Sequence, residues 1–360
     1  MLSKLGQSPL VVGLALSLLV FLGVLGLRLA GSFETFELAV YDWYLRLRPD
    51  APADARIVLI TVTENDIRQQ GTWPLPDATI AHALDIVAAS RPRAIGLDIY
   101  RDIPVPPGHD MLETVLRSHP NIVTVMKVGL TAETSVPPTA VLRGTEQVGF
   151  ADVVVDPGGT VRRGLLFLDQ EGSTFYAFAY RLALLYLQAE NIRPRPDATH
   201  PQYLRLGRTT IPPFEANDGG YIRADARGYQ FLLDFQGGHH AFPAFPLTAL
   251  LAGTVDPAAI HDKVVLIGIT ATSVKDVFYT PHSRGRQADQ RLPGVALQAH
   301  SVSQLLKAAL QGHATITSPS DLQKALWLLL WSVLGTAAGL YIRSPWRLAL
   351  LAGSASSGSG

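Results

Sequence analysis

Residues 56–63 read RIVLITVT and residues 93–100 read RAIGLDIY, and these two runs decide the fold. Both are short, almost continuously aliphatic and rich in β-branched side chains, which is typical of strands buried on both faces of a sheet. Two further runs, NIVTVMKVG at 121–129 and DKVVLIGIT at 262–270, repeat the pattern. Strands of this kind belong to parallel sheets whose two faces are covered by helices.

Helical segments separate these strands. Apolar residues follow helical spacing over residues 78–90, and a shorter helix is expected over 110–118. The alternation of strand and helix predicts an α/β fold with a mainly parallel sheet. One long apolar helix is expected over 173–190, and a final helix over 295–311.

The middle of the chain predicts a β-hairpin inserted into this fold. The turn sequence D-P-G-G at 156–159 lies between two strand-like runs. Arg162 and Arg163 follow the turn, and we expect them on a solvated face of the hairpin.

Two apolar segments flank this region. The first has 23 uncharged residues between Lys4 and Arg28, enough to span a bilayer. A cleaved signal peptide is the alternative, but Arg28 stands where a cleavage site would lie. The second segment covers residues 325–342, with aromatic residues towards its ends. A buried globular helix is the alternative there, although no face of that helix is polar.

The charges around these segments predict the topology. Arg343 and Arg347 lie in the short loop 343–347, which the positive-inside rule places in the cytoplasm. The large region between the two helices then lies outside. The expected division is a cytoplasmic tip and membrane helix (1–32), an extracytoplasmic domain (33–323), a membrane helix (324–342), a cytoplasmic loop (343–347), the start of a truncated membrane helix (348–353) and a linker-like tail (354–360).

A helix is expected to continue from the first membrane segment up to Pro49. Phe36, Val40, Tyr44 and Leu47 fall on one stripe of that helix. We expect this stripe to pack on the outer domain and to couple it to the membrane.

Composition excludes several classes of protein. The 360 residues are 48% hydrophobic and 17% charged, so the chain is not intrinsically disordered. Lys plus Arg and Asp plus Glu each number 30, and this balance argues against nucleic acid as a partner. The absence of cysteine excludes thiol catalysis, disulfides and thiolate metal sites. No P-loop, protein-kinase or HExxH motif is present, and the sequence indicates no cofactor.

Seven motifs, in the same order, resemble the CHASE type-2 (CHASE2) extracytoplasmic sensory domain of bacterial signalling receptors. They are YDWYLRLRP (41–49), RIVLITVTEND (56–66), GTWPLP (71–76), PRAIGLDIY (92–100), VVVDPGGTVRR (153–163), DKVVLIGITA (262–271) with Asp276, and LPGVALQAHSVSQLL (292–306). The resemblance implies a domain in the bacterial inner membrane whose signal passes to a cytoplasmic output domain, a nucleotide cyclase first and a kinase next. It also implies a homodimer. One departure is Asp77, where the family commonly has a basic residue.

Acidic residues follow three of the expected strands. Glu64 and Asp66 follow the first, Asp98 ends the second, and Asp276 follows the last. Ligands of open parallel sheets bind beyond the carboxyl ends of the strands. If the strands are neighbours, these carboxylates converge on a site for a polar or cationic small ligand, or for a hard cation. The alternative is a structural role in ion pairs and loop caps.

Two other features are candidates. Trp73 of GTWPLP is a candidate wall for the ligand pocket, or else it packs a loop on the core. Gly335 and Gly339 form a GxxxG motif that would bring two membrane helices together. The expected function is therefore a sensor without catalysis of its own. The alternatives are a membrane-anchored periplasmic enzyme that uses the carboxylates as acid and base, or an assembly module that docks a partner protein.

Overall fold

The computed structural model describes residues 9–49, 51–129, 131–235, 241–283 and 291–341. The chain divides into two compact units. The helical unit comprises residues 1–40, 216–224 and 317–360, and the α/β unit comprises residues 41–215 and 225–316. The predicted loop 343–347, the helix start at 348–353 and the tail 354–360 lie outside the described residues.

A six-stranded sheet forms the centre of the α/β unit, and all of its pairings are parallel. The predicted mainly parallel α/β fold is thereby confirmed. The strand order is β13 (Ala244–Pro246), β1 (Ile57–Val62), β14 (Val264–Ile269), β2 (Ala94–Asp98), β3 (Ile122–Met126) and β4 (Val148–Phe150).

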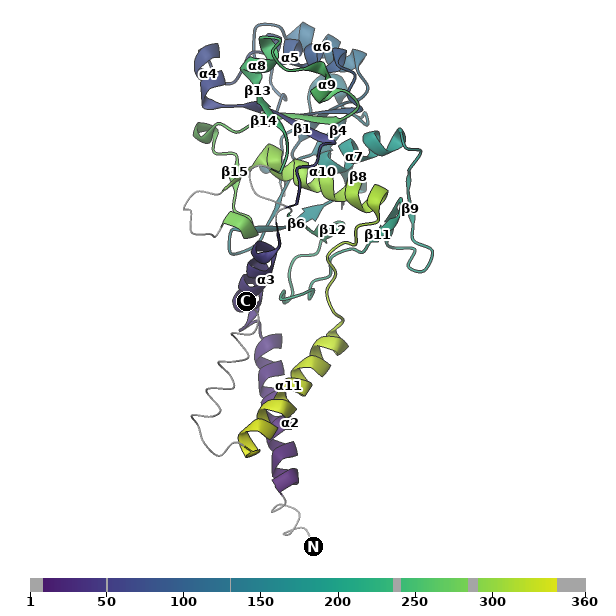
Figure 1. Ribbon diagram of the computed structural model, residues 1–360. Coiled ribbons are helices and arrows are strands. Elements are labelled where there is room, and N and C mark those ends of the chain that lie inside the picture. The colour runs from purple at the N-terminus through teal and green to yellow at the C-terminus, as the bar shows by residue number, and fades with distance from the viewer. Residues whose placement is uncertain (1–8, 50, 130, 236–240, 284–290, 342–360) are drawn as a thin grey trace. The chain divides into compact units, whose positions relative to one another are not determined.

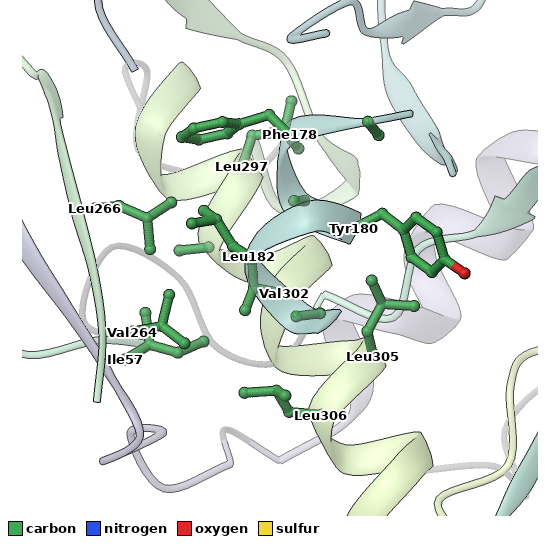
Figure 2. Packing of buried hydrophobic residues seen from close by; sticks show 14 of the residues in the cluster. Ile57, Phe178, Tyr180, Leu182, Val264, Leu266, Leu297, Val302, Leu305 and Leu306 are labelled. Atoms are coloured by element: carbon green, nitrogen blue, oxygen red, sulfur yellow. The ribbon is translucent and has the colours of Figure 1, made fainter. Parts of the chain in front are cut away.

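Helices cover both faces of this sheet, as the continuous apolar strands require (Figure 1). One face carries α5 (Asp77–Ala89) and α6 (His109–Ser118), and the other carries α7 (Phe178–Gln188) and α10 (Gly294–Gln311). Figure 2 shows side chains of α7 and α10 packed together beside strand residues Ile57, Val264 and Leu266.

Glycines in the strands set how closely α7 and α10 approach. A Cβ atom at Gly96 of β2 would lie 2.6 Å from Phe178 of α7. A Cβ atom at Gly268 of β14 would lie 2.5 Å from Val295 of α10. Both contacts are too short for a larger residue unless the facing side chain or its helix moves.

Smaller sheets complete the α/β unit. The predicted hairpin is present, because β5 (Val154–Val155) pairs with β6 (Val161–Leu165) in antiparallel fashion and β12 (Gln230–Leu232) adds a third strand. Three further small sheets consist of β7 (Phe167–Gln170) with β8 (Ser173–Tyr176), of β9 (Pro194–Pro196) with β10 (Leu204–Leu206) and β11 (Thr209–Ile211), and of β15 (Val277–Phe278) with β16 (Leu292–Pro293). The short α-helices of this unit are α4 (Glu64–Gln70), α8 (Leu247–Leu251) and α9 (Pro257–Ile260).

Two expectations about helices are wrong. The segment 173–190 is not one helix, because Ser173–Tyr176 pair with Phe167–Gln170 across a turn at Gly172 (φ 78°). The helix α3 (Glu34–Leu47) exists, but its predicted packing stripe is exposed: Phe36 is 69% and Tyr44 63% accessible. Its buried residues are instead Asp42 and Leu45.

The helical unit contains α2 (Pro9–Leu29) and α11 (Asp321–Tyr341), which pack against each other. A Cβ atom at Gly13 of α2 would lie 2.8 Å from Leu340 of α11. Within the described residues, one helical stretch, Val11–Leu29, is long and apolar enough to cross a membrane, and 11% of it is buried. Most of the second predicted membrane segment forms the helix α11, and its crossing of a membrane remains a proposal.

Candidate functional site

Three predicted acidic positions lie at the carboxyl edge of neighbouring strands. The strand β14 pairs with β1 on one side and with β2 on the other. Glu64 follows β1, Asp98 ends β2, and Asp276 follows β14 by way of a short 3₁₀ turn at Thr272–Val274. The sequence analysis predicted a common site only if these strands are neighbours, and β1, β14 and β2 are neighbours in the sheet.

Asp98 lies beside the start of α10. It pairs across the sheet with Gly268, and a Cβ atom on that glycine would lie 3.3 Å from the Asp98 Cβ and 2.5 Å from Val295. The carboxylate is half-buried and accepts no hydrogen bond from any described residue. Burial, and to a lesser extent the charge of Asp276, raise its pKa to about 8.

Asp276 meets the first residue of the same helix. A Cβ atom at Gly294 would lie 2.4 Å from Asp276 Oδ2, so a larger residue there would displace the Asp276 carboxylate. The Gly294 amide donates to the backbone carbonyl of Asp276 at 3.1 Å. Burial raises the pKa of the half-buried Asp276 carboxyl, which accepts no hydrogen bond from a described residue.

Two further residues of this edge were missed by the sequence analysis. Tyr100 follows β2, and its pKa is raised by burial and by the charges of Asp98, Asp152 and Asp276. Asp152 follows β4 and accepts the amides of Val128 at 2.8 Å and Gly129 at 3.2 Å. Both residues lie just beyond the end of a strand, and this position in the sequence could have indicated them as site residues. The site around Asp98 and Asp276, called here the acidic edge, therefore combines free carboxylates with a phenol.

Glu64 has a partner of its own. Its Oε1 accepts the Ser273 amide at 2.7 Å and the Thr272 hydroxyl at 3.3 Å, and Oε2 accepts the Ser273 hydroxyl at 3.2 Å. These bonds, led by the one from the Ser273 amide, lower the pKa of the Glu64 carboxyl. Glu64 thus holds the turn that leads to Asp276. Its direct contact with a ligand stays a prediction.

Asp66 is engaged in the fold. It is fully buried and completes a capping box with Thr63 at the start of α4. Its Oδ2 accepts the Thr63 amide at 2.7 Å, and its Oδ1 accepts the Thr248 amide at 2.7 Å. Both oxygens are therefore occupied by protein donors, which favours the structural alternative for Asp66.

Trp73 and Asp77 lie on the α5 side of the sheet. Trp73 is half-buried and packs on the apolar cluster formed with α5 and α6, as in the packing alternative. Asp77, the departure from the family pattern, is fully buried beside Arg101 Nε at 3.1 Å and His109 Nδ1 at 3.0 Å. The acid therefore stabilises this loop internally.

The prediction for Arg162 and Arg163 is wrong, because both are buried. Arg162 binds Asp42 of α3 through Nε (2.6 Å) and Nη2 (2.8 Å), and it binds Asp156 through Nη1 (2.6 Å). Arg163 Nη2 binds the other oxygen of Asp156 at 2.8 Å. Side-chain exposure in these ion pairs is 5% or less. The D-P-G-G turn therefore presents an acid to both arginines, and α3 is bound to the hairpin.

The candidate dimerisation residues Gly335 and Gly339 are exposed on α11. A Cβ atom at either position would meet no protein atom within 4 Å. The face that carries GxxxG is therefore not used in packing within the described chain.

The family model for the CHASE2 domain matches residues 18–337, nearly the whole chain. The chain belongs to the CHASE2 domain family. CHASE2 domains are extracytoplasmic sensory domains of membrane signalling receptors. A sensory domain is not a catalyst, which accords with the expectation that this chain has no activity of its own. Neither the curated proteins nor the solved structures that were compared gave a match.

Proposed function

We propose that this CHASE2 chain is the sensory and membrane region of a bacterial receptor and that it binds its stimulus at the acidic edge. The observation that carries the proposal is the pair Asp98 and Asp276, two half-buried carboxylates without hydrogen-bond partners among the described residues. Half-buried carboxylates that no protein group donates to are available to an external donor, which supports a ligand at this edge.

The chemistry of the pair favours a small organic cation. In their ionised forms the two carboxyls accept hydrogen bonds from ammonium or guanidinium groups. Burial and the charge of Asp276 raise the pKa of Asp98, and a bound cation would lower it again and favour the ionised form. Tyr100 adds an aromatic ring and a hydroxyl at the same edge. Among the described residues, no group of three or more His, Asp or Glu side chains is arranged to hold a metal ion. We therefore place an organic cation before a hard metal cation.

A ligand at the acidic edge would act first on α10, because the Asp276 carboxylate lies against Gly294, the first residue of that helix. Further along α10, Gln304 donates to the Leu232 carbonyl at 3.0 Å and accepts the Asp234 amide at 2.8 Å. Leu232 belongs to β12, which pairs with β6, the strand that carries Arg162. Arg162 holds Asp42 of α3. This chain of contacts supports a relay from the ligand to α3.

The proposed receptor function also specifies a membrane topology and a cytoplasmic output domain. We propose that residues 33–323 lie outside the cytoplasm of the bacterial inner membrane and that α11 returns the chain inside. The output domain would be a nucleotide cyclase, with a kinase as the second choice. A single Cys at position 345 tests the topology, since the chain has no other cysteine. An impermeant maleimide added to intact cells should leave it unlabelled, and labelling would overturn the orientation.

Ligand binding is tested on the full chain in detergent. Methylammonium, putrescine, guanidinium, Mg²⁺ and Ca²⁺ are added in turn, and the thermal unfolding midpoint is recorded. A stabilising cation should lose its effect in Asp98→Asn and Asp276→Asn and keep it in Asp262→Asn, an exposed carboxylate in an ion pair with Arg93. Equal effects in all three variants would exclude the acidic edge as the site. Chemical turnover of a probe, lost in Asp98→Asn, would favour the enzyme alternative.

A further inference from the structure

A cavity lies within the helical unit, at the end of α2. It has a volume of about 750 Å³. The last turn of α2, the first turn of α3, the loop 216–224 and the start of α11 all contribute to its wall. Its lining includes Arg28, Glu37, Gly219, Ser318, Lys324 and Trp327.

Arg28 and Lys324 in this wall are positioned by hydrogen bonds to protein groups, and each has an N–H group that could donate to a ligand. Arg28 binds Glu37 through Nε (3.0 Å) and Nη2 (3.1 Å) and the Gly219 carbonyl through Nη2 (2.8 Å), so its Nη1 has no acceptor among the described residues. Lys324 Nζ donates to the Asn217 carbonyl at 2.6 Å and to Asp321 at 3.2 Å, which leaves one N–H. Both side chains are nearly buried, with 11% and 12% exposure.

The charge of the lining is suited to a monoanion. In the lining, Arg28 and Lys324 carry two positive charges and Glu37 carries one negative charge, a sum of +1. Asp321, which pairs with Lys324, lies outside the lining and is 77% exposed, so water screens its charge. A phosphodiester carries one negative charge and accepts hydrogen bonds from Arg and Lys. The Arg28 guanidinium is already oriented by Glu37, which reduces the entropy lost on binding.

The apolar surroundings connect the cavity to lipid. Arg28 lies in the last turn of the Val11–Leu29 span, so the cavity is located where the hydrocarbon region would end. Trp327, which is 59% exposed, and Leu328 continue the wall along α11. Tryptophan is enriched at this depth, between acyl chains and headgroups. Exposed leucines of α2, among them Leu22 and Leu29, supply the surface that acyl chains would cover.

We infer that this cavity binds the phosphodiester headgroup of a membrane phospholipid, with Arg28 and Lys324 donating to the phosphate and Trp327 beside the glycerol and acyl chains. The inference rests on the proposed membrane anchoring by α2. A bound lipid would join the end of the span to α3 and to the loop 216–224, so the lipid becomes part of the structure at the membrane surface.

The test uses the full chain in vesicles made either of phosphatidylglycerol and phosphatidylethanolamine or of a phosphate-free glycosyl diacylglycerol. After gentle transfer to detergent, native mass spectrometry counts the lipids that remain bound. Wild type should retain phospholipid, and Lys324→Gln should reduce its occupancy at least about fivefold, as expected for the loss of about 1 kcal/mol. Arg28→Gln should reduce it further. Arg68→Gln, which changes an exposed cation of the α/β unit, is the matched control and should match wild type.

Further arms separate the possible failures. Flotation of the chain with both kinds of vesicle measures anchoring alone, so failure to float contradicts the proposed function, while flotation without retained phospholipid contradicts the headgroup site. Equal retention in wild type and Lys324→Gln also overturns it. Glycerophosphoglycerol and inorganic phosphate, added at millimolar concentration, should not displace the lipid, because they lack acyl chains. Full displacement by either would assign the cavity to a soluble phosphate and contradict a lipid site.

Discussion

Asp42 of α3 and Arg162 of β6 form a two-point ion pair, Nε to Oδ1 at 2.6 Å and Nη2 to Oδ2 at 2.8 Å, with side chains that are 2% and 5% exposed. The two residues are 120 positions apart. The pair holds the buried side of α3 on the hairpin that carries Asp156. Under the proposed function, α3 is the segment that leads from α2 into the sensory domain, and this pair is one link of the proposed relay.

Removing one partner of this pair should destabilise the α/β unit strongly. Asp42→Ala removes the two hydrogen bonds from Arg162 Nε and Nη2 and one of the carboxylates that balance this buried charge, and the loss of a buried ion-pair partner typically costs about 3–5 kcal/mol. The free energy of unfolding, measured by denaturant titration of the full chain in detergent, checks this. The control is Arg227→Ala, which breaks an exposed pair with Asp225 (72% and 55% exposed) and should cost about 1 kcal/mol or less. Equal losses in the two variants would contradict a stabilising role for the buried pair.

Asp98 should make the protein less stable as the pH rises. Its pKa is raised from 3.8 to about 8 in the folded protein, so the folded state holds a proton that the unfolded state releases near pH 4. Stability is then fully present below about pH 4 and falls as the pH increases towards about 8. Asp98→Asn removes this loss and should raise Tm at pH 9 by roughly 2–4 °C or more, equivalent to at least about 1 kcal/mol.

The same substitution should have little effect at pH 4, where Asp98 is protonated in the folded state. Asp262→Asn serves as the control, since Arg93 lowers the pKa of that exposed carboxyl. Its variant should show no stabilisation at pH 9. A constant difference between Asp98→Asn and wild type from pH 4 to pH 9 would show that the carboxyl does not titrate in this range.

Asp66 should matter for stability and not for ligand binding. Asp66→Ala removes the acceptor for the Thr63 amide in the capping box of α4 and the acceptor for the Thr248 amide, which should lower the free energy of unfolding by about 1–3 kcal/mol. Asn65→Ala, the exposed neighbour, should change it by less than about 0.5 kcal/mol. Calorimetry with whichever cation stabilises wild type should give the same affinity for Asp66→Ala. A loss of affinity at unchanged stability would return Asp66 to the ligand site.

The GxxxG face of α11 should mediate association between two chains. Gly335 and Gly339 lie about one turn apart on an open face, and leucine at both positions would hold two backbones apart. Energy transfer between labelled full chains in vesicles should show association weakened by about 1–2 kcal/mol in the double variant. Gly23→Leu with Gly26→Leu, two open positions on α2, is the matched control. If both double variants weakened association equally, the effect would not be specific to the GxxxG motif and the prediction would be contradicted.

The sequence by itself determined the parallel α/β fold, most of its helices and the family. The strands at 57–62 and 264–269 are aliphatic throughout, and burial on both faces of a sheet is the structure that such runs adopt. The α5 and α6 helices follow from local spacing in the same way. Seven motifs in order were sufficient for the family, since each is a short local pattern. The acidic strand ends were visible for the same reason.

Only the tertiary structure decided which of the acids are free. The insertion of β14 between β1 and β2 brings Asp276 to Asp98, and it joins segments about 170 residues apart. It also supplies partners that no local pattern reveals: Thr248 for Asp66, Ser273 for Glu64 and Asp42 for Arg162. From the neighbouring sequence alone, a charged side chain near a turn is expected to be exposed to solvent. Its burial depends on an opposite charge distant in the sequence, because a buried ion is stable only where a partner replaces water.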